Sequence, residues 1–215
     1  MDTDGWARLG REALAFLLAA TCPGCDLPGT LLCAQCRALL APHPIRTSTP
    51  QGLPVQAALA YEGVVARSIR RLKEDGATML AHPLGAAVAG ILTEADAAVV
   101  PVPTSRAAYR RRGYRVPDLL VRRAGFHAHR MLASARRTGD QRALDREARA
   151  RNVAGSLRVR GGAAPGTRVV IFDDVVTTGA TLDEAARALR EAGLNPIGAV
   201  ALAATPRRID SAGNF

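Results

Sequence analysis

The segment at residues 168–181, RVVIFDDVVTTGAT, places two carboxylates beside a short loop of hydroxyl-bearing residues. Its apolar start has the length and β-branched content of a buried strand, which we expect at residues 169–172. Asp173 and Asp174 follow, and after the turn at 177–181 the spacing of LDEAARALREAG predicts a helix that ends at Gly193. Backbone N–H groups and hydroxyls at such a helix start bind phosphate. The adjacent carboxylates can accept hydrogen bonds from two neighbouring hydroxyls, as on a ribose.

A buried strand that ends in a solvated acidic turn is the alternative interpretation, but it does not explain the fixed spacing of these residues. Two acids followed at fixed distance by T-T-G-x-T resemble the phosphoribosyl-pyrophosphate (PRPP) binding motif of type I phosphoribosyltransferases, and every defining position matches. By this resemblance, Asp173 and Asp174 hold the ribose hydroxyls. The 5′-phosphate is assigned to the loop residues Thr177, Thr178, Gly179, Ala180 and Thr181.

A nucleotide-binding P-loop is excluded by the same sequence. That motif needs a lysine after its second glycine, G-x-x-x-x-G-K-[ST], and no such pattern occurs. The only lysine of the chain is Lys73, and Glu74 follows it. The phosphate chemistry of this chain therefore differs from that of P-loop ATPases.

All four cysteines lie in one short window, as two C-x-x-C pairs separated by seven residues. Two such pairs allow four thiolates to converge on one tetrahedral ion, so we predict a structural zinc site. Disulfides and a thioredoxin-like redox pair are the alternatives, but the first suits a secreted chain and the second leaves one pair unexplained. The predicted zinc ligands are Cys22, Cys25, Cys33 and Cys36.

The stretch at 6–21, WARLGREALAFLLAAT, has the outline of a secretion signal, with arginines before an apolar run. The run at 13–20 is too short to span a membrane, and A-A-T-C is a poor lipoprotein cleavage site. Its apolar residues share one helical face, which favours an amphipathic helix packed on the protein. Since no other segment reaches membrane-spanning length, we expect a soluble, cytoplasmic protein without membrane insertion.

Positive charge is concentrated in one part of the chain. The formal net charge is +10, and residues 106–151 contain 14 arginines against four acids. Such a basic block suits the phosphates of a small polyanionic substrate or those of nucleic acid. A solvated arginine-rich surface is the alternative.

Strands and helices are predicted to alternate, which indicates an α/β fold with a parallel sheet flanked by helices and ligands at the carboxyl ends of the strands. We expect an N-terminal helix and cysteine unit at 1–41, a linker at 42–54, the main domain at 55–206 and a flexible tail at 207–215. Further strands are expected at 55–61, 97–103, 156–159 and 196–203, and helices at 64–73, 79–92, 118–123 and 125–132.

The cysteine unit in front of this region makes the layout similar to the ComF (ComFC) family of competence proteins, predicted type I phosphoribosyltransferases named for DNA uptake. The similarity covers about residues 15–205. Its signatures are the YEG at 61–63, the L-K at 72–73, the VPVP at 100–103, the RGY at 112–114 and the T-x-x-Q … R-x-x-N-V run at 138–153. The resemblance implies a type I phosphoribosyltransferase-like sheet behind a four-cysteine zinc knuckle.

The resemblance also implies a reaction and its residues. Pyrophosphate would leave C1 of PRPP, with Mg²⁺ bridging the pyrophosphate and ribose hydroxyls. Thr104, Ser105 and Arg106 would bind the pyrophosphate, while Gln141 and Arg149 would belong to a mobile loop that closes over the ligand. Asp173, Asp174 and Arg106 would act in catalysis.

The chain departs from the family pattern after Tyr114, where Arg115-Val116 replaces Asn-Gln, and no residues identify a nucleobase pocket. Three functions stay open. The protein is an active phosphoribosyltransferase of unknown acceptor, a PRPP sensor, or a competence factor that binds single-stranded DNA and contacts other DNA-uptake proteins. The intact PRPP motif favours PRPP binding first, transfer second, and nucleic acid as a further partner.

Overall fold

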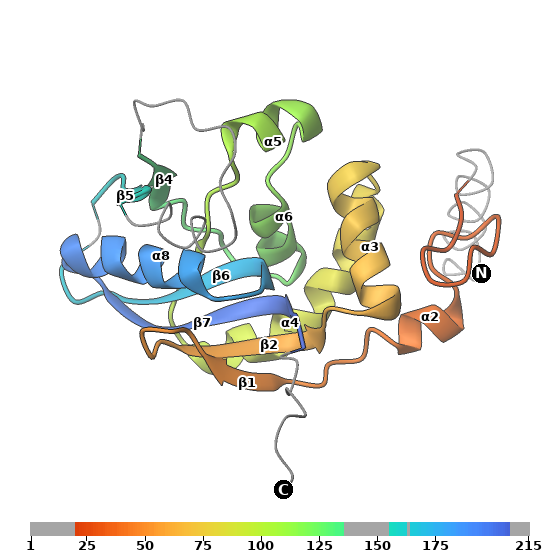
Figure 1. Ribbon diagram of the computed structural model, residues 1–215, viewed down its shortest axis with the longest axis horizontal. Helices are drawn as coiled ribbons and strands as arrows, with labels where there is room; N and C mark the ends of the chain where they lie inside the picture. The colour runs from red at the N-terminus through yellow and green to blue at the C-terminus, as the bar shows by residue number, and fades with distance from the viewer. Residues whose placement is uncertain (1–19, 136–154, 163, 207–215) are drawn as a thin grey trace, which may run out of the picture.

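The computed structural model describes residues 20–135, 155–162 and 164–206 (Figure 1). The predictions for residues 1–19, for Gln141 and Arg149, and for the tail at 207–215 lie outside the described residues. Within the described ranges, no helix combines the length and apolar character that crossing a membrane requires.

A five-stranded sheet in the order β1-β2-β7-β6-β3 forms the centre of the molecule. All of its neighbouring strands are parallel except β1 and β2, which pair antiparallel. Its strands are β1 (Ile45–Ser48), β2 (Pro54–Ala60), β3 (Ala98–Pro101), β6 (Arg168–Val176) and β7 (Asn195–Ala204). The predicted α/β class, a mostly parallel sheet flanked by helices, is confirmed.

Alternate residues of β6 enter two separate hydrophobic cores, because successive side chains of a strand point to opposite faces. Val170 and Phe172 pack in the first core, and Val169 and Ile171 pack in the second. The helices on the first face are α3 (Gly63–Glu74), α4 (Ala81–Ala95) and α6 (Val116–Arg123). Helix α8 (Ala180–Glu191) covers the second face (Figure 1). The run of apolar residues in β6 is thus explained by burial on both sides.

A small antiparallel ribbon, β4 (Leu132–Ser134) with β5 (Leu157–Val159), lies beside α8 (Figure 1). Glu184 of α8 accepts a hydrogen bond from the Leu157 N–H at 2.9 Å, and Arg187 donates to the Leu157 carbonyl at 3.2 Å. Leu132 and Leu157 are buried in the core beneath. The ribbon is therefore fixed on the sheet by apolar packing and by a buried carboxylate.

The segment expected as a linker, 42–54, contributes strand β1 to the sheet. Ile45 pairs with Ala57 and Ser48 pairs with Pro54, so the segment forms a hairpin with β2. The proline and threonine content that predicts a linker is also tolerated in an edge strand. Helix α2 (Ala34–Ala38) and the short 3₁₀ helix η1 (Thr78–Leu80) complete this half of the chain.

The prediction of a helix at 125–132 is wrong, and the helix at 106–112 was not predicted. Gly125 has a φ of 91° and ends α6, and the Phe126 N–H donates to the Val121 carbonyl. The chain then runs extended beside β3, where the His129 N–H donates to the Val99 carbonyl at 2.9 Å. Helix α5 (Arg106–Arg112) replaces part of the predicted loop after residue 103, and Ser105 caps its first turn.

Candidate functional site

The paired carboxylates lie inside strand β6. The strand was predicted to end at residue 172, but it continues past both acids. Asp173 pairs with Ala201 of β7, and the ladder continues to Val176. Asp174 is 8% exposed, and the Asp173 carboxylate accepts a hydrogen bond from the Asp174 N–H at 2.8 Å. The carboxyl-terminal part of β6 thus holds one buried acid, Asp174, beside one partly buried acid, Asp173.

Lys73, from the last turn of α3, donates to the Asp174 carboxylate at 2.9 Å. The Lys73 side chain is 26% exposed and that of Asp174 is 11% exposed, so water screens this ion pair only in part. Sequence analysis did not include Lys73 among the site residues. A signal was available, because it is the only lysine in a chain that otherwise uses arginine.

Burial and the neighbouring Asp174 carboxylate raise the pKa of Asp173 from its ordinary value of 3.8 to about 8. Lys73 pairs with Asp174 and lowers the Asp173 pKa by less than those two causes raise it. At neutral pH the ligand-free pair therefore holds a proton on Asp173. A ligand that supplies hydroxyl donors or a cation favours the ionised form of both acids.

The threonine loop after β6 leads directly into α8, as the motif predicts. Thr177 and Thr178 are exposed, and Ala180 is the first residue of the helix. Gly179 has a φ of 83°, and a Cβ there would lie 3.1 Å from the Thr49 side chain. Glycine is therefore required at position 179 both by the backbone conformation and by the close approach of Thr49.

The β1–β2 hairpin supports this loop from the side. Thr49 is 4% exposed, and its hydroxyl accepts a hydrogen bond from the Leu53 N–H at 3.0 Å. The Gln51 N–H donates to Asp183 in the first turn of α8 at 3.2 Å. The segment expected to be a linker thus holds the start of α8, and with it the loop, in place.

The other predicted loop, at Thr104, Ser105 and Arg106, follows the neighbouring strand β3. The Val102 N–H donates to the Phe172 carbonyl at 2.8 Å, which fixes the end of β3 beside the end of β6. The Ser105 hydroxyl accepts from the Ala108 N–H at 3.2 Å, so Ser105 caps α5. The side chain of Ser105 is therefore engaged, while Arg106 is exposed.

The predicted residues line two separate cavities. Thr177, Thr178 and Gly179 line a cavity of about 260 Å³ together with residues of β1. Thr104 and Arg106 line another, of about 250 Å³. Neither lining includes Asp173 or Asp174. The structure thus places the two loops at the carboxyl ends of adjacent strands, β6 and β3, and the acids on the strand that leads to the first.

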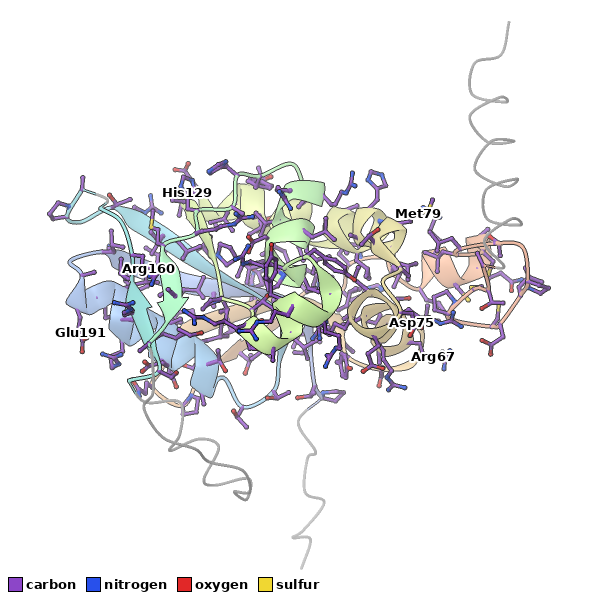
Figure 2. All side chains as sticks on the ribbon, turned by 90° about the horizontal axis from the view of Figure 1, so that it is seen from above. Arg67, Asp75, Met79, His129, Arg160 and Glu191 are labelled. Carbon is purple, nitrogen blue, oxygen red and sulfur yellow. The ribbon has the colours of Figure 1, made fainter. Side chains whose placement is uncertain are left out.

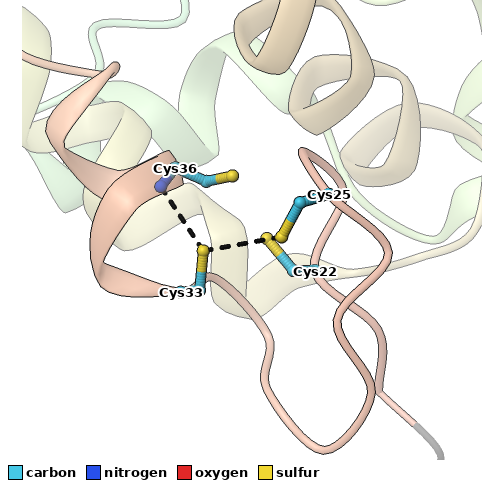
Figure 3. A group of neighbouring side chains, drawn as sticks. All are labelled: Cys22, Cys25, Cys33 and Cys36. Atoms are coloured by element: carbon cyan, nitrogen blue, oxygen red, sulfur yellow. Dashed lines mark hydrogen bonds between the residues drawn. The ribbon is translucent and has the colours of Figure 1, made fainter.

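The four cysteine side chains lie together in one cluster, as Figure 3 shows. All four are free thiols, and their Sγ atoms lie within 4.8 Å of one another. A tetrahedral zinc with Zn–S bonds of about 2.3 Å needs sulfurs roughly 3.8 Å apart. The Cys36 N–H donates to Cys33 Sγ at 3.4 Å, and a Cβ at Gly24 would lie 2.3 Å from Cys36 Sγ. The donor set and the close packing therefore fit a metal such as zinc.

The thiols differ in how easily they ionise. Burial opposes ionisation of Cys22, but hydrogen bonds from the backbone N–H groups of Cys33, Gly24 and Cys25 outweigh burial and lower the pKa of Cys22 to about 6. Burial and the adjacent thiols raise the pKa of Cys36 to about 12. Four thiolates therefore coexist here only when a cation compensates them.

Helix α3 connects the cysteine unit to the acid pair. Arg67 donates to the carbonyls of Pro23 and Gly24, both at 2.6 Å, and Arg71 donates to the Thr21 hydroxyl at 3.0 Å. In Figure 2, Arg67 lies on α3 beside the cysteine unit. One helix thus contacts the unit through its arginines and the acid pair through Lys73.

Comparison with known proteins shows which proteins parts of this chain resemble. The model of the phosphoribosyl transferase domain family matches residues 135–211, which include the acid pair and the threonine loop. This part of the chain is therefore similar to phosphoribosyl transferase domains.

Competence protein F of Haemophilus influenzae is 35% identical over 107 residues, covering 46% of this chain and 47% of that protein. The chain thus matches about half the length of this relative. The resemblance to the ComF family, which the sequence indicated, is confirmed by this relative, the domain match and the cysteine cluster.

Three solved structures show a limited similarity to this chain. Adenine phosphoribosyltransferase is 15% identical with a TM-score of 0.39, covering 80% of this chain and 89% of that one. Orotate phosphoribosyltransferase from Aeropyrum pernix is 20% identical with a TM-score of 0.36, covering 78% and 76%. The allosteric regulatory enzyme of purine biosynthesis is 20% identical with a TM-score of 0.37, covering 57% and 26%.

Proposed function

We propose that this protein binds PRPP at the end of β6 and transfers its phosphoribosyl group to an acceptor, releasing pyrophosphate. The observation that carries the proposal is the joining of two features on one strand–loop–helix unit. Asp173 and Asp174 lie near the end of β6, and the loop of Thr177–Gly179 follows the last residue of that strand and leads into α8. This arrangement offers oxygen acceptors for two hydroxyls and donors for one phosphate within a single unit.

In the proposed reaction, the bond between C1 and the pyrophosphate oxygen breaks and pyrophosphate takes the electron pair. The acceptor nucleophile forms the new bond to C1. Asp173 and Asp174 orient the ribose and lie near the positive charge that develops on it, and Thr177 and Thr178 hold the 5′-phosphate. Arg106 compensates the charge of the leaving pyrophosphate. None of these residues is assigned as the base that removes the acceptor's proton.

A divalent cation fits the same site. Asp173 and Asp174 present carboxylate oxygens of the kind that Mg²⁺ prefers, and together with the substrate's phosphates they would hold it. When bound, Mg²⁺ would neutralise charge on the pyrophosphate. The role of Lys73 is to compensate Asp174 in the ligand-free protein, where no such cation acts.

We further propose that the cysteine unit binds one structural zinc ion through all four thiolates. With four protein ligands the site is closed, so its role is to fold residues 20–41 and not to catalyse. A reducing compartment keeps such thiols available to zinc, which supports the proposal that the protein acts in the cytoplasm.

Calorimetry with PRPP and Mg²⁺ tests the proposal directly. We expect the parent protein to bind PRPP, and the Asp173→Asn/Asp174→Asn variant to lose both that binding and the rise in melting temperature that PRPP causes. Asp96→Asn is the matched control, because Asp96 has an exposed side chain away from this site. Equal PRPP-induced shifts in the parent and the double variant would refute the assignment. A screen for pyrophosphate release over candidate acceptors would then separate a transferase from a PRPP sensor.

A second candidate function, binding of single-stranded DNA in DNA uptake, is favoured by the last turn of α5. Arg110, Arg111 and Arg112 follow one another there, and the first two are exposed. Consecutive arginines on a helix surface contact phosphates without reading sequence. The similarity to competence protein F supports a connection with DNA-uptake proteins.

The salt dependence of DNA binding tests this second candidate. Arg110→Glu/Arg111→Glu should flatten the dependence of the affinity for single-stranded DNA on salt, because fewer counterions are released. Arg37→Glu/Arg190→Glu, which changes two exposed arginines elsewhere, is the charge-matched control. Negligible DNA binding by the parent at physiological salt would exclude the function.

A further inference from the structure

Helix α5, which begins with Arg106, buries none of its seven residues. Figure 1 shows this helix at the edge of the molecule, away from the sheet. Ser105 caps its first turn, and Gly113, with a φ of 79°, ends it with a hydrogen bond from the Gly113 N–H to the Tyr109 carbonyl at 2.8 Å. Core packing by its own side chains therefore does not hold α5 in place.

The residue after Gly113 connects α5 to the rest of the fold. Tyr114 is half-buried and packs against the first hydrophobic core. Its hydroxyl donates to the carbonyl of Leu72, a fully buried residue in the last turn of α3. That carbonyl is among the last four of the helix, which have no partner within it. Tyr114 therefore satisfies a free end of α3 and attaches the end of α5 to it.

The hydroxyl of Tyr114 keeps its proton at neutral pH. Burial raises the pKa of Tyr114, and the positive charge of Arg112 lowers it by less. The hydroxyl therefore remains a donor to the Leu72 carbonyl. Arg112, the last residue of α5, has a buried Nε without a hydrogen-bond partner among the described residues. At this end of α5, the hydrogen bond to α3 thus comes from Tyr114.

The Leu72 carbonyl lies next to the residue that reaches the acid pair. Lys73 follows Leu72 and donates to the Asp174 carboxylate at 2.9 Å. The end of α3 is therefore attached to β6 through Lys73 and to α5 through Tyr114. In the proposed function, the acid pair holds the ribose, and Arg106 at the start of α5 compensates the pyrophosphate. Tyr114 thus connects the elements that would carry the two parts of PRPP.

We propose that Tyr114 is a positioning residue, which holds α5 against the end of α3 and so sets the spacing between the acid pair and the loop at 104–106. This assignment rests on the proposed function, because PRPP is the ligand that spans both parts. A ligand that contacts two places at once gains affinity only when their spacing matches its own dimensions. Tyr114 acts through this spacing and not through contact with PRPP.

The test compares PRPP with ribose 5-phosphate, each titrated by calorimetry with Mg²⁺ into the parent and into Tyr114→Phe. The substitution removes the hydroxyl and retains the ring that packs against the core. We expect the affinity for PRPP to fall about fivefold, because α5 must then be ordered when the ligand binds. Ribose 5-phosphate uses only the acid pair and the threonine loop, so its affinity should stay unchanged.

Tyr109→Phe is the matched control. Tyr109 lies on α5 and is 40% exposed, and its ring, which the substitution retains, lies 4.4 Å from the Arg115 guanidinium. This variant should bind both ligands as the parent does. Hydrogen exchange of the ligand-free protein gives a second measurement. The amides of α5 should exchange faster in Tyr114→Phe, and at the parent's rate in Tyr109→Phe.

Three results would overturn the proposal. Equal affinity for PRPP in the parent and in Tyr114→Phe would remove the positioning role and leave the proposed function intact. An equal loss of affinity for PRPP and for ribose 5-phosphate would show that Tyr114 only supports the fold around the acid pair. A parent that binds no PRPP would overturn the proposed function itself, and this proposal with it.

Discussion

The four thiols of the cysteine unit and the two carboxylates on β6 are both groups of acids packed against one another, yet only the carboxylates have a cation from the protein. Lys73 reaches Asp174 at 2.9 Å, whereas no basic side chain within the described ranges pairs with the cysteine sulfurs. A site for a permanently bound metal needs no such partner. A site that binds and releases its ligand must also be stable when empty, and an internal cation provides that stability.

Loss of one cysteine ligand should have the largest effect. Cys36→Ser removes a thiolate that no protein group can replace, so we expect the loss of stoichiometric zinc and unfolding of residues 20–41. Metal analysis and hydrogen exchange of this segment measure both. Leu27→Ser, an exposed change inside the same unit, should retain zinc. Parent protein that purifies without zinc, or with disulfide bonds between these cysteines, would contradict the assignment of the cysteine unit as a metal site.

Removal of the internal cation should be the next largest effect. Lys73→Met leaves Asp174 buried without its partner, and we expect a loss of about 2–3 kcal/mol in the free energy of unfolding, less than for a fully buried pair because Lys73 keeps contact with water. Urea unfolding measures it. Lys73→Met/Asp174→Asn should recover most of the loss, and a double-mutant cycle with no coupling would show that the ion pair contributes nothing.

The proton on Asp173 gives a smaller effect with a defined pH dependence. Because its pKa is raised from 3.8 to about 8, the unfolded chain has lost this proton between those values while the folded protein retains it. Stability of the ligand-free protein should therefore fall as the pH rises through this window and level off above about pH 8. Asp173→Asn should flatten the slope and raise the melting temperature near neutral pH by about 2–4 °C. A parent and variant with parallel melting curves against pH would contradict the raised pKa.

The smallest effect on the fold should come from the threonine loop. Thr178 is exposed, so Thr178→Val should change the stability of the ligand-free protein by less than about 0.5 kcal/mol. Because the Thr178 hydroxyl would no longer donate to phosphate, the affinity for PRPP should fall about tenfold, which calorimetry measures. Thr93→Val, which changes an exposed threonine of α4 outside the threonine loop, is the matched control. An unchanged PRPP affinity would remove Thr178 from the site.

The features that the sequence predicted are those in which the chemistry is local. The acids, the threonine loop and α8 lie within about two dozen consecutive residues, and the cysteines lie within 15, so spacing alone was enough to predict that each group lies together. Gly125 shows where prediction from local sequence fails, because a glycine next to a helical pattern is compatible with the end of one helix or the beginning of another. Only the hydrogen bond from His129 to β3 decides that the chain is extended there.

The features that sequence analysis missed depend on contacts between distant residues. Lys73 meets Asp174 across 101 residues of chain, and no periodicity connects the two positions. The cavity beside the end of β3 is lined by arginines from separate segments, and of these only Arg106 was predicted as a site residue. Strand β1 was expected as a linker because its composition is that of a loop, and its strand character comes from pairing with β2.

Helix α3 also implies an order of events as the chain folds. Its arginine contacts to the cysteine unit close loops of 43 and 44 residues, whereas Lys73 must wait for a partner 101 residues away that is itself held by the finished sheet. Shorter loops close with a smaller loss of chain entropy. We therefore expect α3 to dock on the cysteine unit early and the acid pair to gain its cation among the last contacts made. A newly synthesised chain would then mature its ligand site only after the rest of the architecture is complete.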